Sequence, residues 1–162
     1  MDALDQWSEF NVAMLGAAAA LAGLVIVAAS VNIAEIIKAP TLTSRLAAAI
    51  AALVLAITAC ALGLIPTLPA FWFAVILVVA SLGAAVFQVH AAQSIARDVR
   101  SDAGTRGAKS ALGFLPVALY LIAGIASFTT QTVALGFAAA GCITAIIAAI
   151  VVSWVALVEV LR

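Results

Sequence analysis

Charged side chains are scarce in this chain of 162 residues. Only 9% of the residues are charged and 67% are apolar, whereas soluble domains have about 25% charged and about 45–50% apolar residues. No segment between the apolar runs is long enough to bury a core of its own. These absences exclude a globular catalytic module, a nucleotide-binding sheet and a nucleic-acid-binding surface.

Motifs that carry catalytic or metal-binding chemistry are also absent. The sequence has no HExxH, GxSxG or CxxC motif and no Gly-rich phosphate loop. Its two cysteines, Cys60 and Cys142, fall in separate apolar runs without a histidine at ligand spacing, so we interpret them as small packing residues. We expect no enzyme and no resident cofactor, which leaves transport, sensing or assembly within a membrane.

Long apolar runs make up most of the chain, and charges or prolines bound them. A membrane-spanning helix takes about 20 residues. The runs predict one all-α transmembrane domain over residues 1–162, with five spans at about 11–37, 46–65, 70–96, 111–128 and 136–158. The last two spans are separated at residues 129–132, because one helix over residues 110–162 would exceed twice the thickness of the hydrocarbon core. Four spans are the alternative.

The charges are divided unequally between the two predicted sides. With five spans, all seven Lys and Arg residues lie on the side of the first and third interhelical loops and of the C-terminus. The positive-inside bias then places the N-terminus outside and the C-terminus in the cytoplasm. Trp7, Trp72 and Phe128 fall at the predicted outer boundary, as interfacial aromatic residues do. We expect membrane lipids as partners and no nucleic acid.

The first span carries a row of small residues at the spacing of close helix contacts. The row consists of Glu9, Ala13, Gly16, Ala20, Gly23, Val27 and Ser30. Small residues let helices approach closely in lipid, so one interpretation is a tight contact within the protomer or between protomers. The other is that several copies surround an axis, with Glu9 as an acidic ring that selects cations and binds a metal ion at the outer mouth. A second face carries Asn11, Ala18, Val25 and Asn32.

Another polar group lies near the cytoplasmic ends of the first and third spans. It comprises Asn32, Glu35, His90, Gln93, Ser94 and Arg97. The spacing of His90, Ser94 and Arg97 puts them on one helical face, at the predicted depth of Glu35. One interpretation is a Glu35–Arg97 ion pair that fixes helix register; the other is a proton or ion relay through Glu35 and His90.

The first helix also resembles sequences of known type. Trp7 and Phe10 form W-x-x-F, residues 16–24 read G-A-A-A-A-L-x-G-L, and residues 30–33 read S-x-N-I. This pattern resembles a group of small multi-pass bacterial membrane proteins, which implies a bacterial inner (plasma) membrane location and four to five helices but no activity or ligand. The layout of an acid at the outer end of a first helix also resembles Orai-type calcium channels.

These observations favour a homo-oligomeric cation channel, with a divalent ion such as Ca²⁺ as a candidate permeant ion and the first helix along the axis. The alternatives are a non-catalytic accessory or scaffold protein that docks partner helices, and a small proton- or ion-coupled transporter with its site at Asn32, Glu35 and His90. The oligomeric state and the position of the first helix distinguish the three.

Overall fold

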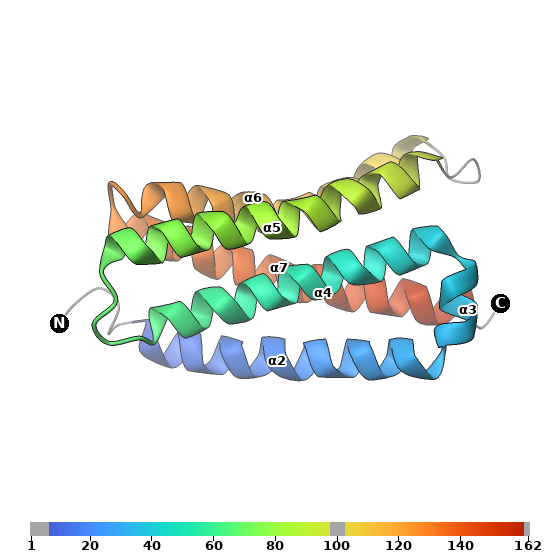
Figure 1. The fold of residues 1–162 in the computed structure, drawn as a ribbon, viewed down its shortest axis with the longest axis horizontal. Helices are drawn as coiled ribbons and strands as arrows, with labels where there is room; N and C mark the ends of the chain where they lie inside the picture. Colours follow the sequence, from blue (N-terminus) through green and yellow to red (C-terminus); the bar gives the residue numbers. More distant parts are fainter. Residues whose placement is uncertain (1–6, 98–102, 161–162) are drawn as a thin grey trace.

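A computed structural model describes residues 7–97 and 103–160, and this part of the chain is an all-helical bundle without strands (Figure 1). The helices are α2 (Ser8–Val31), α3 (Ile33–Lys38), α4 (Pro40–Gly63), α5 (Ala70–Arg97), α6 (Ala103–Ala126) and α7 (Gln131–Val160). Four of them, α2, α4, α5 and α7, contain apolar segments long enough to cross a membrane. The apolar part of α6, Ser110–Ala126, is shorter.

The helix boundaries follow local sequence signals. Pro40 is the first residue of α4, where a missing N–H costs nothing. Residues 127–130, of which three are Ser or Thr, separate α6 from α7, close to the predicted break. The sequence predicts one helix over the first span, 11–37, but the structure has two, because α2 ends at Val31 and Asn32 caps it. The Asn32 side chain donates a hydrogen bond to the Ala28 carbonyl oxygen at 3.1 Å, and such side-chain bonds compete with helical backbone pairing.

The helix α4 lies at the centre of the bundle. It packs against α2, α5 and α7, while α6 packs against α5 and α7. Successive long helices run in opposite directions, so that α2 begins at one end of the bundle and α7 finishes at the other (Figure 1). Buried residues of α4 are mostly small, among them Ala48, Ala52, Ala56 and Ala59. Small side chains let the neighbouring backbones approach α4 closely.

Three glycines lie at close helix contacts. A Cβ atom added to Gly63 of α4 would lie 2.5 Å from Asn11 Nδ2 of α2. One added to Gly124 of α6 would lie 2.7 Å from a Val78 methyl group of α5, and one at Gly141 would lie 3.1 Å from the Tyr120 ring. A larger residue at any of these positions would force the neighbouring group to shift, so the three glycines serve packing within the protomer.

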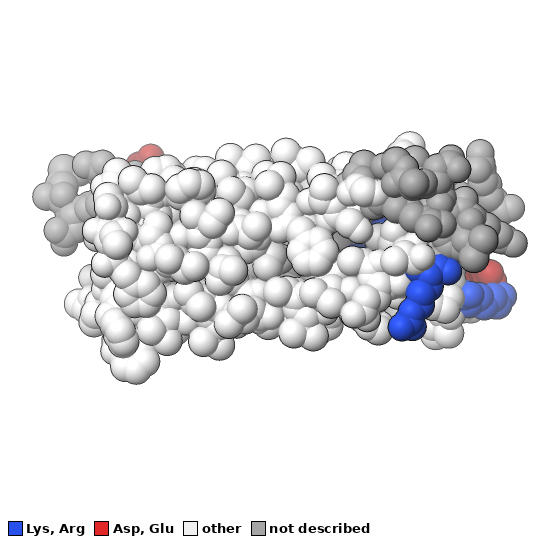
Figure 2. Space-filling view, turned by 90° about the horizontal axis from the view of Figure 1, so that it is seen from above, with Lys and Arg blue, Asp and Glu red and all other residues white. Residues whose placement is uncertain are grey.

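The described charges separate toward the two ends of the bundle. Lys38, Arg45 and Arg97 lie at the end where α3 connects α2 to α4, whereas Glu9 lies at the opposite end. Figure 2 shows the coloured side chains near the ends and a white surface between them. Phe71 packs against Trp72 and Phe128 at the Glu9 end, with ring centroids 5.7 and 6.0 Å apart. The charged residues at positions 2, 5, 98, 100, 102 and 162 lie outside the described residues.

Candidate functional site

The row of small residues on α2 faces outward from the protomer. Glu9, Ala13, Gly16, Ala20, Gly23, Val27 and Ser30 are all exposed. A Cβ atom added to Gly16 or Gly23 would meet no atom within 4 Å. The Ser30 hydroxyl donates a hydrogen bond to the Ile26 carbonyl oxygen of its own helix at 2.8 Å. The protomer therefore leaves the whole row open to whatever surrounds it.

The opposite face of α2 makes the contacts inside the protomer. Asn11, Ala18 and Val25 are buried, and Asn32 is half-buried. The interpretation of the small row as a contact within the protomer is thus wrong. The physical reason lies in the packing of α2 on α4: Ala18 and Ala22 are small and buried on this face of α2, and Gly63 of α4 makes room for the Asn11 amide.

Larger side chains flank the exposed row. Val12 and Ile26 lie along one side of it, and Leu24 and Val31 lie along the other, all exposed. Exposed positions of α5 and α7 are instead mostly bulky, among them Val79, Phe87, Ile143, Ile147 and Trp154. Small exposed residues such as Gly83 and Gly136 occur singly on these two helices, whereas on α2 they form a row.

Glu9 stands in the first turn of α2, where the helix dipole favours a carboxylate. It is exposed, and Trp7 and Phe10 beside it form an edge-to-face pair with ring centroids 5.5 Å apart. No group of three His, Cys, Asp or Glu residues that could hold a metal ion occurs among the described residues.

The inner polar group is not assembled within the protomer. Glu35 accepts a hydrogen bond from Lys38 Nζ at 2.8 Å, which is a pair within α3. His90, Gln93 and Arg97 are exposed on α5 and Ser94 is half-buried there. At this end α4 lies between α3 and α5 (Figure 1). Neither the Glu35–Arg97 pair nor the Glu35–His90 relay is formed, because the central helix separates their partners.

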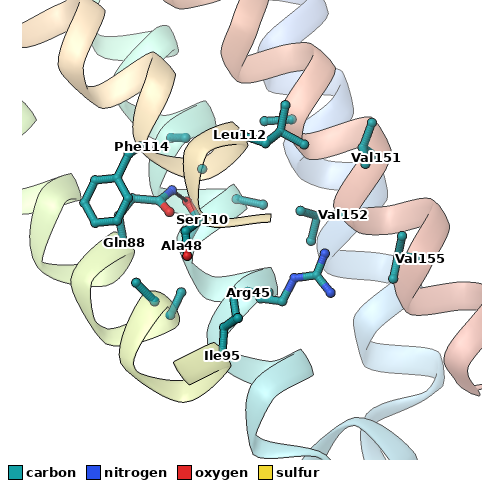
Figure 3. A pocket seen from close by; sticks show the side chains of 16 residues that line it. Arg45, Ala48, Gln88, Ile95, Ser110, Leu112, Phe114, Val151, Val152 and Val155 are labelled. Carbon is teal, nitrogen blue, oxygen red and sulfur yellow. Dashed lines mark hydrogen bonds between the residues drawn. The ribbon is translucent and has the colours of Figure 1, made fainter. Parts of the chain in front are cut away.

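A cavity that the sequence did not indicate lies at the same end, between α4, α5, α6 and α7. Its volume is about 310 Å³, and small and aliphatic side chains form most of its wall. Arg45 and Gln88 are its two large polar side chains, 9% and 6% exposed (Figure 3). The available signal was the position of Arg45, directly before the alanine-rich part of the second apolar run.

The two cysteines meet in the core of the bundle. Cys60 Sγ of α4 and Cys142 Sγ of α7 are 4.0 Å apart, and both residues are buried. The neighbouring Tyr120 hydroxyl is buried and has no hydrogen-bond partner among the described residues. Packing residues are expected to be buried, but the sequence did not show that these two residues touch.

Comparison with known sequence families, curated proteins and solved structures gives no match. The class of the protein therefore follows from its fold, which is that of an all-helical, membrane-embedded protein with at least four long apolar helices. The resemblance of its first 40 or so residues to small bacterial membrane proteins stays a prediction.

Proposed function

We propose that the protein functions as a homo-oligomer whose copies meet through the exposed small row of α2, and that the assembled first helices surround a path for cations. The observation that carries this proposal is the exposure of all seven positions from Glu9 to Ser30. The row is outside the protomer core, yet its residues have the sizes of a helix-packing interface.

Contact with lipid does not explain why the residues of this row are small. Acyl chains are as apolar as leucine, so side chains that face them need no small size, whereas Gly and Ala allow two helix backbones to approach closely. Bulky residues on the exposed faces of α5 and α7, including Ile147 and Val79, are what contact with lipid permits. The contrast favours a second helix as the neighbour of α2.

A path for ions between copies is favoured over one inside a protomer. The cavity between α4, α5, α6 and α7 is lined mainly by Ala, Val, Leu and Ile. Glu35 and His90, which a transporter site would need together, are separated. Glu9 is an exposed acid at the end of the small row. Several copies around an axis would bring their Glu9 carboxylates together, and rings of acids select cations and supply oxygen ligands for Ca²⁺.

The proposal includes five spans with the N-terminus outside and the C-terminus in the cytoplasm of a bacterial inner membrane. Its support is the helical length of α6, similar to that of its neighbours, and the position of Lys38, Arg45 and Arg97 at one end of the bundle. Basic residues collect on the cytoplasmic side of membrane proteins. Glu9 would then face the exterior.

Ion flux into liposomes tests the proposed function. Purified protein in sealed liposomes should admit K⁺ or Ca²⁺, monitored by an entrapped fluorescent indicator, and Glu9→Gln should reduce the preference for cations over anions. Glu35→Gln is the matched control, because Glu35 pairs with Lys38 at the other end and lies off the small row. Unchanged flux and selectivity in Glu9→Gln would remove Glu9 from the mechanism.

The same row also fits a non-conducting scaffold that docks a partner helix, since close approach needs only small residues. The specific observation in its favour is the pair of flanking ridges, Val12 with Ile26 and Leu24 with Val31, between which a single helix could lie. A protein that is a monomer or part of a hetero-complex in mild detergent, and that passes no ions, would select this alternative.

A further inference from the structure

The cavity between α4, α5, α6 and α7 has the features of a ligand site inside one protomer. Its volume of about 310 Å³ lies at the lower end of the roughly 300–1,000 Å³ of small-molecule sites. Its wall is built mainly from residues such as Ala52, Ala91, Leu112 and Val151. Hydrocarbon suits such a wall, because an apolar cavity excludes water and accepts apolar molecules.

Arg45 places a positive charge at one end of this cavity. It lies five positions after Pro40, the first residue of α4, and so near the end of the bundle that carries the other described cations. Figure 3 shows its guanidinium extending from α4 toward Val152 and Val155 of α7. Arg45 already interacts within the protomer, and its five N–H donors allow it to hold a further acceptor as well.

Gln88 fixes the wall on the other side. Its Nε2 donates a hydrogen bond from α5 to the Ala48 carbonyl oxygen of α4 at 3.2 Å. Its Oε1 lies so close to α6 that a Cβ atom added to Gly113 would be only 2.5 Å away. One buried side chain thus connects three of the four helices around the cavity, which makes the cavity a built part of the fold.

We propose that this cavity binds an acyl chain of an anionic amphiphile, with the carboxylate or phosphate head against Arg45 and the chain directed inward toward Ala52. Arg is the side chain best suited to these heads, because its planar fork matches the geometry of both groups. The direction is that of a lipid in the surrounding leaflet, since Arg45 lies toward the end of α4 and Ala52 is two turns deeper. The site lies within one protomer and does not depend on how copies associate.

Native mass spectrometry of the purified protein in a neutral detergent tests this site. The probes are oleate, dioleoylphosphatidylglycerol and, as a zwitterionic control, dioleoylphosphatidylcholine. We expect one oleate or one phosphatidylglycerol per protomer and much weaker retention of phosphatidylcholine. Preference for phosphatidylglycerol would identify the source as a phospholipid, and preference for oleate would identify a free fatty acid. Equal retention of all three would overturn the proposal.

Two variants locate the ligand. Arg45→Gln should weaken binding of the anionic probes by about tenfold or more, as expected for loss of a charged hydrogen-bonded partner. Ala92→Phe should weaken it by filling the cavity, because Ala92 lines it and is only half-buried. Lys38→Gln and Ala96→Phe are the matched controls, since both residues are exposed and neither lines the cavity.

Binding that survives Ala92→Phe would place the probe outside the cavity and contradict the proposal, as would full binding by Arg45→Gln. Circular dichroism and gel filtration establish that each variant is folded. If Arg45→Gln does not fold, Arg45→Lys together with Ala92→Phe decides: the lysine variant retains the charge and should keep more affinity than Ala92→Phe.

Discussion

The helices α2 and α4 have the same length of 24 residues and are similarly apolar, yet they are buried to very different extents in the bundle. In the most apolar 18-residue window of α4, 61% of the residues are buried, against 17% in that of α2. Both helices are rich in alanine. In α4 the small residues contact α2, α5 and α7, whereas the small row of α2 contacts no other helix of the protomer.

The difference shows that hydrophobicity does not determine burial in this protein. Lipid removes the hydrophobic drive between helices, so contacts are selected by how closely backbones can approach. A helix whose small residues are mostly buried against neighbours, such as α4, belongs at the centre. A helix whose small row is exposed, such as α2, is expected to use that row with another chain.

The largest effect on the protomer is expected in the centre of α4. Ala56 is fully buried, so Ala56→Leu should overpack the bundle and lower the free energy of unfolding by about 1–3 kcal/mol. Ala20→Leu on the exposed row of α2 is the matched control and should leave the unfolding of the monomer unchanged. SDS titration of detergent-solubilised monomer, followed by circular dichroism, measures both. Equal losses would show that the two helices do not differ as described.

A smaller loss in the free energy of unfolding is expected where α2 and α4 are in contact. Gly63→Ala would bring a Cβ atom within 2.5 Å of Asn11 Nδ2, so the amide must turn away, at a cost of about 1 kcal/mol. Adding Asn11→Ala should recover most of this loss, because it removes the group that clashes. Chemical unfolding of both single variants and the double variant gives the coupling between the two sites. Independent, additive effects would place the strain elsewhere.

A substitution on the exposed row is expected to raise the stability of the monomer rather than lower it. Gly16→Ala meets no atom within 4 Å, so it should raise the stability of the monomer by about 0.5–1 kcal/mol through helix propensity. Gly83→Ala on α5, which is equally open, should do the same. The unfolding midpoints in detergent measure the gain. A loss in Gly16→Ala alone would mean that the row packs against its own protomer.

The smallest effect is expected in α3, which connects the two helices. The Glu35–Lys38 pair is 55% and 69% exposed, so Glu35→Gln should change the free energy of unfolding by less than about 0.5 kcal/mol. Lys38→Gln should have a similarly small effect. Detergent unfolding curves provide the comparison. A loss well above this limit from Glu35→Gln alone would restore a structural or relay role for Glu35.

The sequence predicted much of the fold but less of the site. Pro40 marks the start of α4, and the polar residues at 129–132 lie at the break between α6 and α7. Local chemistry therefore allows both boundaries to be predicted from the sequence. The break at Asn32 was not predicted. An asparagine side chain can leave the backbone hydrogen bonds of a helix intact or can bond to a backbone carbonyl itself, as Asn32 does with Ala28. The sequence does not show which of the two occurs. Which face of α2 is buried depends on what α4 presents, and the cavity at Arg45 depends on four helices together. The periodicity of a single helix predicts neither the buried face of α2 nor the cavity.

Cross-linking in native membranes tests whether copies of the chain meet along the small row of α2, as we propose. A cysteine should be placed on the row by Ala20→Cys and on α5 by Gly83→Cys, both exposed positions, with the wild-type chain and its buried thiols as background. Under mild oxidation we expect covalent dimers from Ala20→Cys and few from Gly83→Cys. Cross-linking that is absent at position 20, or equal at positions 20 and 83, would contradict it.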